Sequence, residues 1–234
     1  MAELRFDGRV AVVTGAGRGL GRSYALLLAS RGAKVVVNDL GTSRRGEGVD
    51  AAPAQQVVDE IRAAGGEAVY SIASVATEED RPGKFYCRAL RRAKRGCHCA
   101  GKAALVGLSN ALALEGADFG IRCNCIVPAA ETRLFEGRDT AAFPPMKPDL
   151  VAPAVAWLAH ESCEATGELL VALAGRMAKA YVAETAGVFQ PSWSIEQVAE
   201  QQRALADRSD QQVFSPVPSG FYDHLGFSFR MART

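Results

Sequence analysis

The segment from residue 10 to residue 39 constrains the fold more than any other part of this 234-residue chain. Residues 10–13 are apolar and mostly β-branched, as in a strand that is buried on both faces. A glycine-rich turn follows at 14–21, and apolar residues then recur at helical spacing: Leu20, Tyr24, Leu27 and Leu28. Residues 34–38 form a second strand, which ends at Asp39. The order of strand, turn, helix and strand predicts an α/β fold with a parallel sheet.

The glycines of this turn suit a dinucleotide. Gly15 permits a tight turn, Gly19 has no Cβ to keep a pyrophosphate away, and Gly21 lets the helix pack close to the strand. The helix then directs its free N–H groups and its positive end at the phosphates. Asp39 accepts hydrogen bonds from both hydroxyls of an adenosine ribose and repels a 2′-phosphate, which favours NAD over NADP, although Arg18 is a residue type that serves such a phosphate. The alternative is a glycine-rich turn that binds no ligand.

The spacing T-G-x-x-x-G-x-G at residues 14–21 resembles that of the short-chain dehydrogenase/reductase family. Three further stretches are similar to the (3R)-hydroxyacyl-CoA dehydrogenase branch, which includes peroxisomal multifunctional enzyme type 2 and bacterial relatives: 5–10, 38–41 and 160–164. The resemblance covers about residues 4–80 and 101–175. It implies a Rossmann-like, doubly wound parallel sheet, oxidation of a secondary alcohol or 3-hydroxyacyl-CoA with NAD, and assembly as a homo-oligomer.

The resemblance also implies further cofactor contacts. Ser74 and Val75 follow the predicted third strand, where a polar residue caps the adenine amine and a valine lies on the ring. Ser74 equally suits a helix N-cap, and both interpretations can hold together. A hydroxyl such as that of Thr132 would meet the pyrophosphate. The other residues that the resemblance places at the cofactor are spread along the chain: Leu20, Leu40, Lys102 and Pro128.

The family pattern is interrupted between residues 81 and 100. Residues 81–99 contain seven Lys or Arg residues and no acid, where the family has a fourth strand, a helix and a fifth strand that carries its catalytic serine. The chain therefore resembles a family member with an internal deletion of about two βα units. One interpretation of the basic segment is an arm for nucleic acid. The simpler one is a solvated basic helix or a disordered joint, so nucleic acid is not an expected partner.

The pattern resumes at His98, which stands where the family has the tyrosine of its Tyr-x-x-x-Lys motif, and Lys102 supplies the lysine. In the family the tyrosine exchanges the proton, and the lysine lowers the phenol pKa and holds the nicotinamide ribose. Histidine exchanges protons near neutral pH, but it reaches roughly 2 Å less far, and a 1 Å misplacement costs about a hundredfold in rate. Three hypotheses stay open: an adenosine-binding family member with little turnover, an oxidoreductase that uses His98 and Lys102, and a non-catalytic interaction protein.

The expected internal deletion changes the order of strands that the sheet can have. The family order 3-2-1-4-5-6-7 would lose its centre, so strand 6 either moves to strand 1, giving 3-2-1-6-7, or the halves stay apart. Residues 1–175 are expected to form the dinucleotide-binding domain and 176–234 a helical extension, with a capping box at Ser194 opening a helix to about residue 206. Apolar patterns predict the remaining helices and strands: helices at 53–65, 103–117 and 149–160, and strands at 67–72, 121–127 and 168–174.

The bulk properties exclude several classes of protein. The net charge of +1 selects neither nucleic acid nor an acidic surface. No apolar run reaches the roughly 20 residues of a membrane helix, and neither end shows a secretory or peroxisomal signal, so a cytoplasmic location is the expectation. The pairs Cys97/Cys99 and Cys123/Cys125 have one residue between the cysteines, fewer than structural zinc prefers, and the second pair fits alternating positions of a strand, so no metal site is expected.

Overall fold

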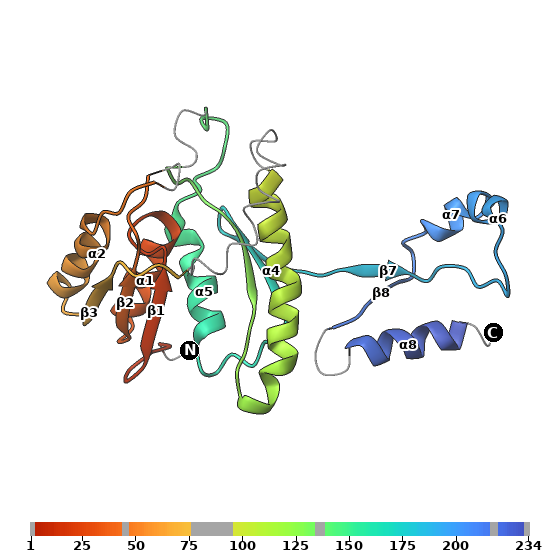
Figure 1. The fold of residues 1–234 in the computed structure, drawn as a ribbon, viewed down its shortest axis with the longest axis horizontal. Coiled ribbons are helices and arrows are strands. Elements are labelled where there is room, and N and C mark those ends of the chain that lie inside the picture. The colour runs from red at the N-terminus through yellow and green to blue at the C-terminus, as the bar shows by residue number, and fades with distance from the viewer. Residues whose placement is uncertain (1–2, 44–46, 76–95, 134–138, 216–219, 232–234) are drawn as a thin grey trace. The chain divides into compact units, whose positions relative to one another are not determined.

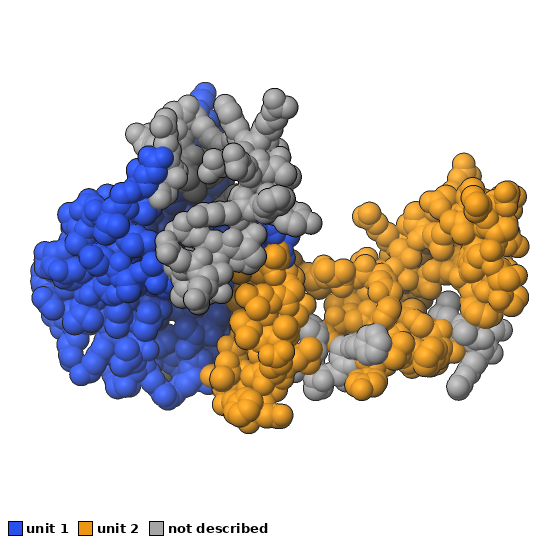
Figure 2. Space-filling model, viewed as in Figure 1, with its two compact units in different colours: residues 1–103, 126–164, 170–178 blue, residues 104–125, 165–169, 179–234 orange. Residues whose placement is uncertain are grey.

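The computed structural model describes residues 3–43, 47–75, 96–133, 139–215 and 220–231 (Figure 1). The chain forms two compact units (Figure 2). Unit 1 comprises 1–103, 126–164 and 170–178, and unit 2 comprises 104–125, 165–169 and 179–234. Within the described residues, no helix is both long enough and apolar enough to span a membrane.

The N-terminal part of unit 1 has the predicted order of strand, turn, helix and strand. Its elements alternate along the chain: β1 (Val10–Thr14), α1 (Gly19–Ser30), β2 (Lys34–Asn38), α2 (Ala52–Ala63) and β3 (Ala68–Ser71). The three strands form a parallel sheet in the order β1-β2-β3. In its register Val12 lies beside Val36, and Val36 lies beside Val69. This parallel βαβαβ unit confirms the α/β class.

The core of this unit lies between β2 and the two helices. Val35 and Val37 of β2 are buried against α1 and α2, and Val57, Val58 and Ile61 of α2 are at most 2% exposed. Burial of each such aliphatic side chain contributes about 1.5–3 kcal/mol. The alternating burial of β2 and the 3.6-residue spacing in α2 therefore fix which face of each element meets the core.

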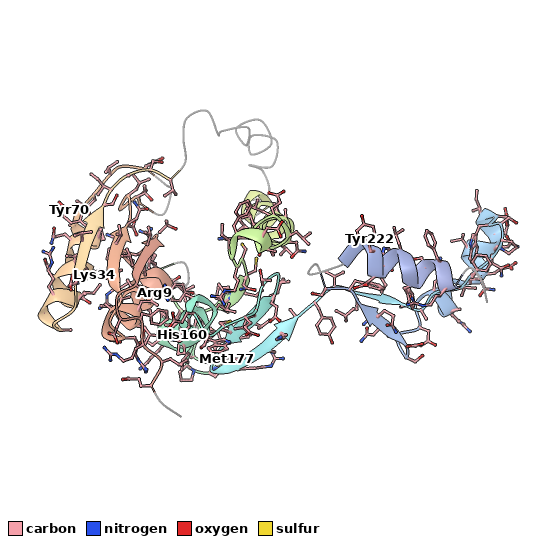
Figure 3. The ribbon with its side chains drawn as sticks, turned by 90° about the horizontal axis from the view of Figure 1, so that it is seen from below. Arg9, Lys34, Tyr70, His160, Met177 and Tyr222 are labelled. Carbon is pink, nitrogen blue, oxygen red and sulfur yellow. The ribbon has the colours of Figure 1, made fainter. Side chains whose placement is uncertain are left out.

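Residues 5–10, near the start of the chain, contact the residues that follow α5 (Ala152–Ala159). Both segments belong to stretches that resemble the dehydrogenase branch. Nδ1 of His160 accepts the Ser162 N–H, so Nε2 is the nitrogen that donates to the Arg5 carbonyl at 3.0 Å. The Phe6 ring stands edge-on to His160 with the ring centroids 5.1 Å apart. Arg9 forms an ion pair with Glu161 beside this contact (Figure 3).

A second three-stranded sheet has the order β4-β5-β6, formed by Cys125–Ala129, Leu169–Leu173 and Arg176–Ala180. Ala174 and Gly175 join β5 to β6 with φ values of 48° and 82°, as in a type I′ hairpin turn. The sequence analysis predicted the strand at 168–174 and missed β6. In unit 1 this sheet meets α1 through a cluster of half-buried and buried apolar residues: Leu20, Tyr24, Ile126, Ala130, Val151, Ala154, Leu170 and Ala172.

The two sheets are separate, so the five-stranded order 3-2-1-6-7 is wrong and the alternative of unjoined halves holds. Within the described residues β1 pairs with β2 alone. The physical reason is that β1 lies at an exposed part of the unit, where Val10 and Val12 are 66% and 65% exposed. An unpaired backbone group is costly only when it is buried. The fold is thus α/β with a reduced number of strands, as predicted.

Two predicted boundaries also need correction. The helix expected at 103–117 is α4 (Gly96–Glu115), and the strand expected at 121–127 is β4, which begins at Cys125. Cys123 therefore precedes the strand, instead of alternating with Cys125 along it. In unit 2, the Asn124 amide donates to the Ala165 carbonyl at 2.7 Å and accepts the Glu168 N–H at 3.0 Å. These side-chain bonds delay the start of the ladder.

The C-terminal extension in unit 2 is mixed, not purely helical. It contains an antiparallel pair, β7 (Ala183–Thr185) with β8 (Gln211–Val213), and three helices: α6 (Ile195–Glu200), α7 (Gln202–Leu205) and α8 (Gly220–Met231). The predicted capping box is confirmed, since Ser194 Oγ accepts the Gln197 N–H and Gln197 Oε1 accepts the Ser194 N–H. The helix divides at Gln201, before the predicted end.

Candidate functional site

The turn between β1 and α1 has a backbone that side chains would obstruct. Gly15 and Gly19 have φ values of 68° and 55°, in the left-handed region that favours glycine. A Cβ at Gly21 would lie 2.2 Å from the Gly15 carbonyl oxygen, well inside any real contact distance. The first turn of α1 therefore lies directly against the turn that precedes it. This closeness aims the free N–H groups of α1 at the space above the glycine turn.

Asp39 connects this turn to the end of β2. Its Oδ2 accepts the Gly17 N–H at 2.8 Å, and its Oδ1 accepts the Gly41 N–H at 2.7 Å. A Cβ at Gly17 would lie 2.9 Å from Oδ2, so only glycine brings its N–H this close. Gly17 was not singled out from the sequence, although it is the second of the four glycines in the 14–21 segment.

The Asp39 carboxylate retains capacity for a ligand. Two carboxylate oxygens offer about four lone-pair positions, and Gly17 and Gly41 each use one. One position on each oxygen remains, which matches the two hydroxyls of a ribose. The side chain is half-buried, where a second anion is poorly screened. A ribose 2′-phosphate would thus be repelled at this point.

Asn38, which was predicted only as the end of a strand and part of the 38–41 resemblance, anchors the loop that carries Ser74 and Val75. It is 7% exposed, and its amide donates to the Ala73 carbonyl at 2.9 Å and to Ser71 Oγ at 3.3 Å. Val75 is 74% exposed, as a side chain available to a flat ring would be. A polar residue that ends an otherwise apolar strand was the available signal for Asn38.

Residues after β4 reach the glycine turn within unit 1. A Cβ at Gly19 would lie 3.1 Å from Thr132 Cγ2, so the Thr132 side chain stands over the turn. Arg133 donates to the Thr42 carbonyl at 3.1 Å, which ties the segment after β4 to the segment after β2. Leu40, beside Asp39, accepts the Asp50 N–H at 2.9 Å. The structure thus brings Thr132 together with the glycines and Asp39.

The electrostatics around α1 favour an anion. The helix has no acid in its first turn, and the Arg18 side chain at its N-cap is exposed and makes no capping hydrogen bond. The positive end of a 12-residue helix therefore faces the glycine turn without a neutralising carboxylate. Further along α1, burial raises the pKa of Tyr24 to about 12. That phenol stays protonated near neutral pH and is not a substitute for the family's proton acceptor.

The residues predicted to take part in the reaction make few contacts with the described part of the chain. His98 and Lys102 lie one turn apart on α4, but the side chain of His98 lies outside the described residues. Lys102 is exposed and makes no hydrogen bond or ion pair with the described part of the chain. Pro128 is an exposed residue of β4. The described residues contain no group of three His, Cys, Asp or Glu side chains arranged to hold a metal.

Comparison with known proteins gives consistent matches. A family model described as short chain dehydrogenase matches residues 9–95. Peroxisomal multifunctional enzyme type 2 of Drosophila melanogaster is 38% identical over 257 positions, which cover 81% of this chain and 43% of that enzyme. A short-chain type dehydrogenase/reductase of Mycobacterium tuberculosis is 32% identical over 279 positions, which cover 88% of this chain and 96% of the relative.

Among solved structures, full-length peroxisomal multifunctional enzyme type 2 from Drosophila melanogaster matches with a TM-score of 0.72 and 32% identity. The match covers 98% of this chain and 50% of that protein, so the chain spans half or less of the multifunctional enzyme. The sequence alignment also indicates how much polypeptide this chain lacks within the matched span. Because 81% of 234 residues is about 190, about 67 of the 257 aligned positions have no counterpart here. That number is close to two βα units of roughly 30 residues each.

Proposed function

Because the chain belongs to the short-chain dehydrogenase/reductase family, we propose that it binds the adenosine half of NAD and that its hydride transfer is impaired. The observation that carries the proposal is the position of the Asp39 carboxylate. It is held by the Gly17 and Gly41 N–H groups at the carboxyl ends of β1 and β2, beside the N-terminus of α1. Dinucleotides bind to α/β sheets at this place.

Each part of the site has a task in this proposal. The N-terminus of α1 and Thr132 hold the pyrophosphate, and Asp39 holds the ribose hydroxyls. Ser74 and Val75, on the loop that Asn38 anchors, hold the adenine. The charge of Asp39 selects NAD over NADP, because a 2′-phosphate would meet a carboxylate that is already hydrogen-bonded in place.

The impairment follows from the reacting half. NAD held at this site would supply the hydride acceptor for a secondary alcohol, and the substrate class that we propose is an alcohol or a 3-hydroxyacyl-CoA. Lys102 keeps the ammonium that holds the nicotinamide ribose. His98 replaces the proton acceptor with a shorter side chain, and we expect the segment that would carry the serine to be among the positions that this chain lacks. A misplacement of about 1 Å costs about a hundredfold in rate.

Calorimetric titration of the full chain with NAD, ADP-ribose and NADP tests the binding half of the proposal. NAD and ADP-ribose are expected to bind with similar affinity, and NADP more weakly. Asp39→Ala removes two hydrogen bonds to a charged acceptor, each about 1.5–3 kcal/mol, so NAD affinity should fall roughly 100-fold or more. Asp59→Ala, an exposed acid of α2, is the matched control and should bind as the parent does. Equal binding by both variants would refute the site.

Nicotinamide absorbance with NAD and a short 3-hydroxyacyl-CoA tests the other half. No signal above the blank is expected from a chain that binds NAD. Turnover that disappears in His98→Ala but persists in His224→Ala, a half-buried control histidine on α8, would establish the competing function, an oxidoreductase that uses His98 with Lys102. Absence of NAD binding together with absence of turnover would instead favour a non-catalytic interaction protein.

A further inference from the structure

The outer edge of β1 is the least protected part of the first sheet. The Lys34 N–H donates to the Arg9 carbonyl at 2.9 Å, and Val10 lies beside Lys34 in the register. In a parallel pair, alternate residues direct their backbone groups to alternate sides. Residues 9, 11 and 13 therefore face β2, and Val10, Val12 and Thr14 direct their N–H and C=O groups outward. The described part of the chain supplies no partner strand on that side.

The side chains of these residues also lack cover. Val10 and Val12 are 66% and 65% exposed, whereas Ala11 and Val13 pack on the core. Val36 of β2 and Val69 of β3 continue the same row, since the register places them beside Val12, and Val69 is 55% exposed. The open edge therefore adjoins a strip of valines, and both would be buried by an added apolar strand.

The opposite edge of the same sheet, formed by β3, is blocked by a charged side chain. By the same alternation, Ala68 and Tyr70 of β3 direct their backbone groups outward. The Arg62 guanidinium donates twice to the Ala68 carbonyl, from Nε at 3.1 Å and from Nη2 at 2.8 Å. Natural sheets block their edges with charged side chains, proline or bulges. β1, with the sequence VAVVT, has none of these.

We propose that the outer edge of β1 binds an extended, uncharged, β-branched segment of a partner polypeptide, which adds a strand beside Val10, Val12 and Thr14. Donors and acceptors alternate along this edge at the two-residue repeat of a strand, about 6.6–6.8 Å, a pattern that an extended polypeptide matches. The relatives carry about 67 more aligned positions than this chain within the matched span. The chain therefore lacks polypeptide that its relatives contain, and in this proposal a partner strand at the β1 edge takes the place of part of it.

Fluorescence anisotropy with a labelled nine-residue peptide of alternating Thr and Val, ended by Lys for solubility, tests the proposal on the full chain. Saturable binding is expected. Val12→Pro removes an outward N–H and leaves the bonds to β2 intact, so the affinity should fall at least about tenfold. Tyr70→Pro is the matched control, because it removes an outward N–H from β3, and it should bind as the parent does (Tyr70 is labelled in Figure 3).

Two further measurements keep the result interpretable. Val12→Lys preserves the backbone and places a charge on the edge, so it should also weaken binding even where Val12→Pro does not fold. A peptide N-methylated at alternate residues cannot form the ladder and should not bind. Absence of saturable binding, or equal binding by parent and Val12→Lys, would overturn the proposal. So would a dimer in analytical ultracentrifugation that Val12→Lys dissociates, because the occupant would then be a second copy of this chain.

Discussion

The tight contact at Gly21 makes Gly21→Ala the most informative single substitution. The new Cβ would lie 2.2 Å from the Gly15 oxygen, 2.8 Å from the Gly15 carbonyl carbon and 3.0 Å from the Ala16 Cα. All three are backbone atoms, so no side chain can rotate away, and the turn or the helix must move by about 1 Å. Overpacking of this kind costs typically 1–3 kcal/mol. For a chain of this size we expect the melting temperature to fall by about 3–10 °C.

The same displacement should weaken cofactor binding, because it shifts the N–H groups that face the pyrophosphate. Differential scanning calorimetry and NAD titration measure the two effects on one protein. Gly107→Ala is the matched control: a Cβ there meets nothing within 4 Å, and alanine within α4 should stabilise by about 0.5–1 kcal/mol. If Gly21→Ala has the same melting temperature and the same NAD affinity as the parent, the inference that α1 lies in close contact with the glycine turn is wrong.

Three more predictions follow from the same unit. Ile61→Ala should lower the free energy of unfolding by about 2–5 kcal/mol in urea titration, because the side chain is 2% exposed; no change would contradict its place in the core. Asn38→Ala should cost about 1–3 kcal/mol and weaken adenosine binding more than Gln55→Ala, an α2 control, because it releases the Ala73 carbonyl. The Tyr24 pKa of about 12 exceeds the unfolded value of 10.0, so its contribution to stability is complete below pH 10 and is lost from pH 10 to 12; Tyr24→Phe should remove that part of the pH dependence.

The elements that the sequence predicted well are those with local causes. β1, α1 and β2 follow from an apolar run, a glycine turn and a helical period within 30 residues, and the capping box at Ser194 spans four residues. The close approach at Gly21 was also predictable, since the spacing of the glycines requires it. In these cases the residues that determine the structure are neighbours in the chain.

The features that the sequence did not predict depend on distant partners. β4 begins at Cys125, not at Ile121, because Asn124 finds partners at 165 and 168. The roles of Gly17 and Asn38 arise from contacts across 22 and 35 residues. Whether the sheet closes after the missing positions depends on the cost of an open edge, which a pattern of residues does not give. The separate sheets therefore had to be found in the structure.

The proposed division of this chain into an adenosine-binding half and an impaired reacting half has a structural basis. The side-chain hydrogen bonds of Asp39 and Asn38 to described residues lie within residues 17–73, and the core beneath them is built by α1, α2 and β2. A loss of polypeptide beyond residue 80 would remove none of these contacts, so we expect this part of the adenosine side to keep its geometry. By the family resemblance, the reacting side needs a proton acceptor on α4 and a serine on a further strand, so it depends on parts of the chain outside this local unit. Binding is expected to survive where catalysis does not, because the two depend on different parts of the sheet.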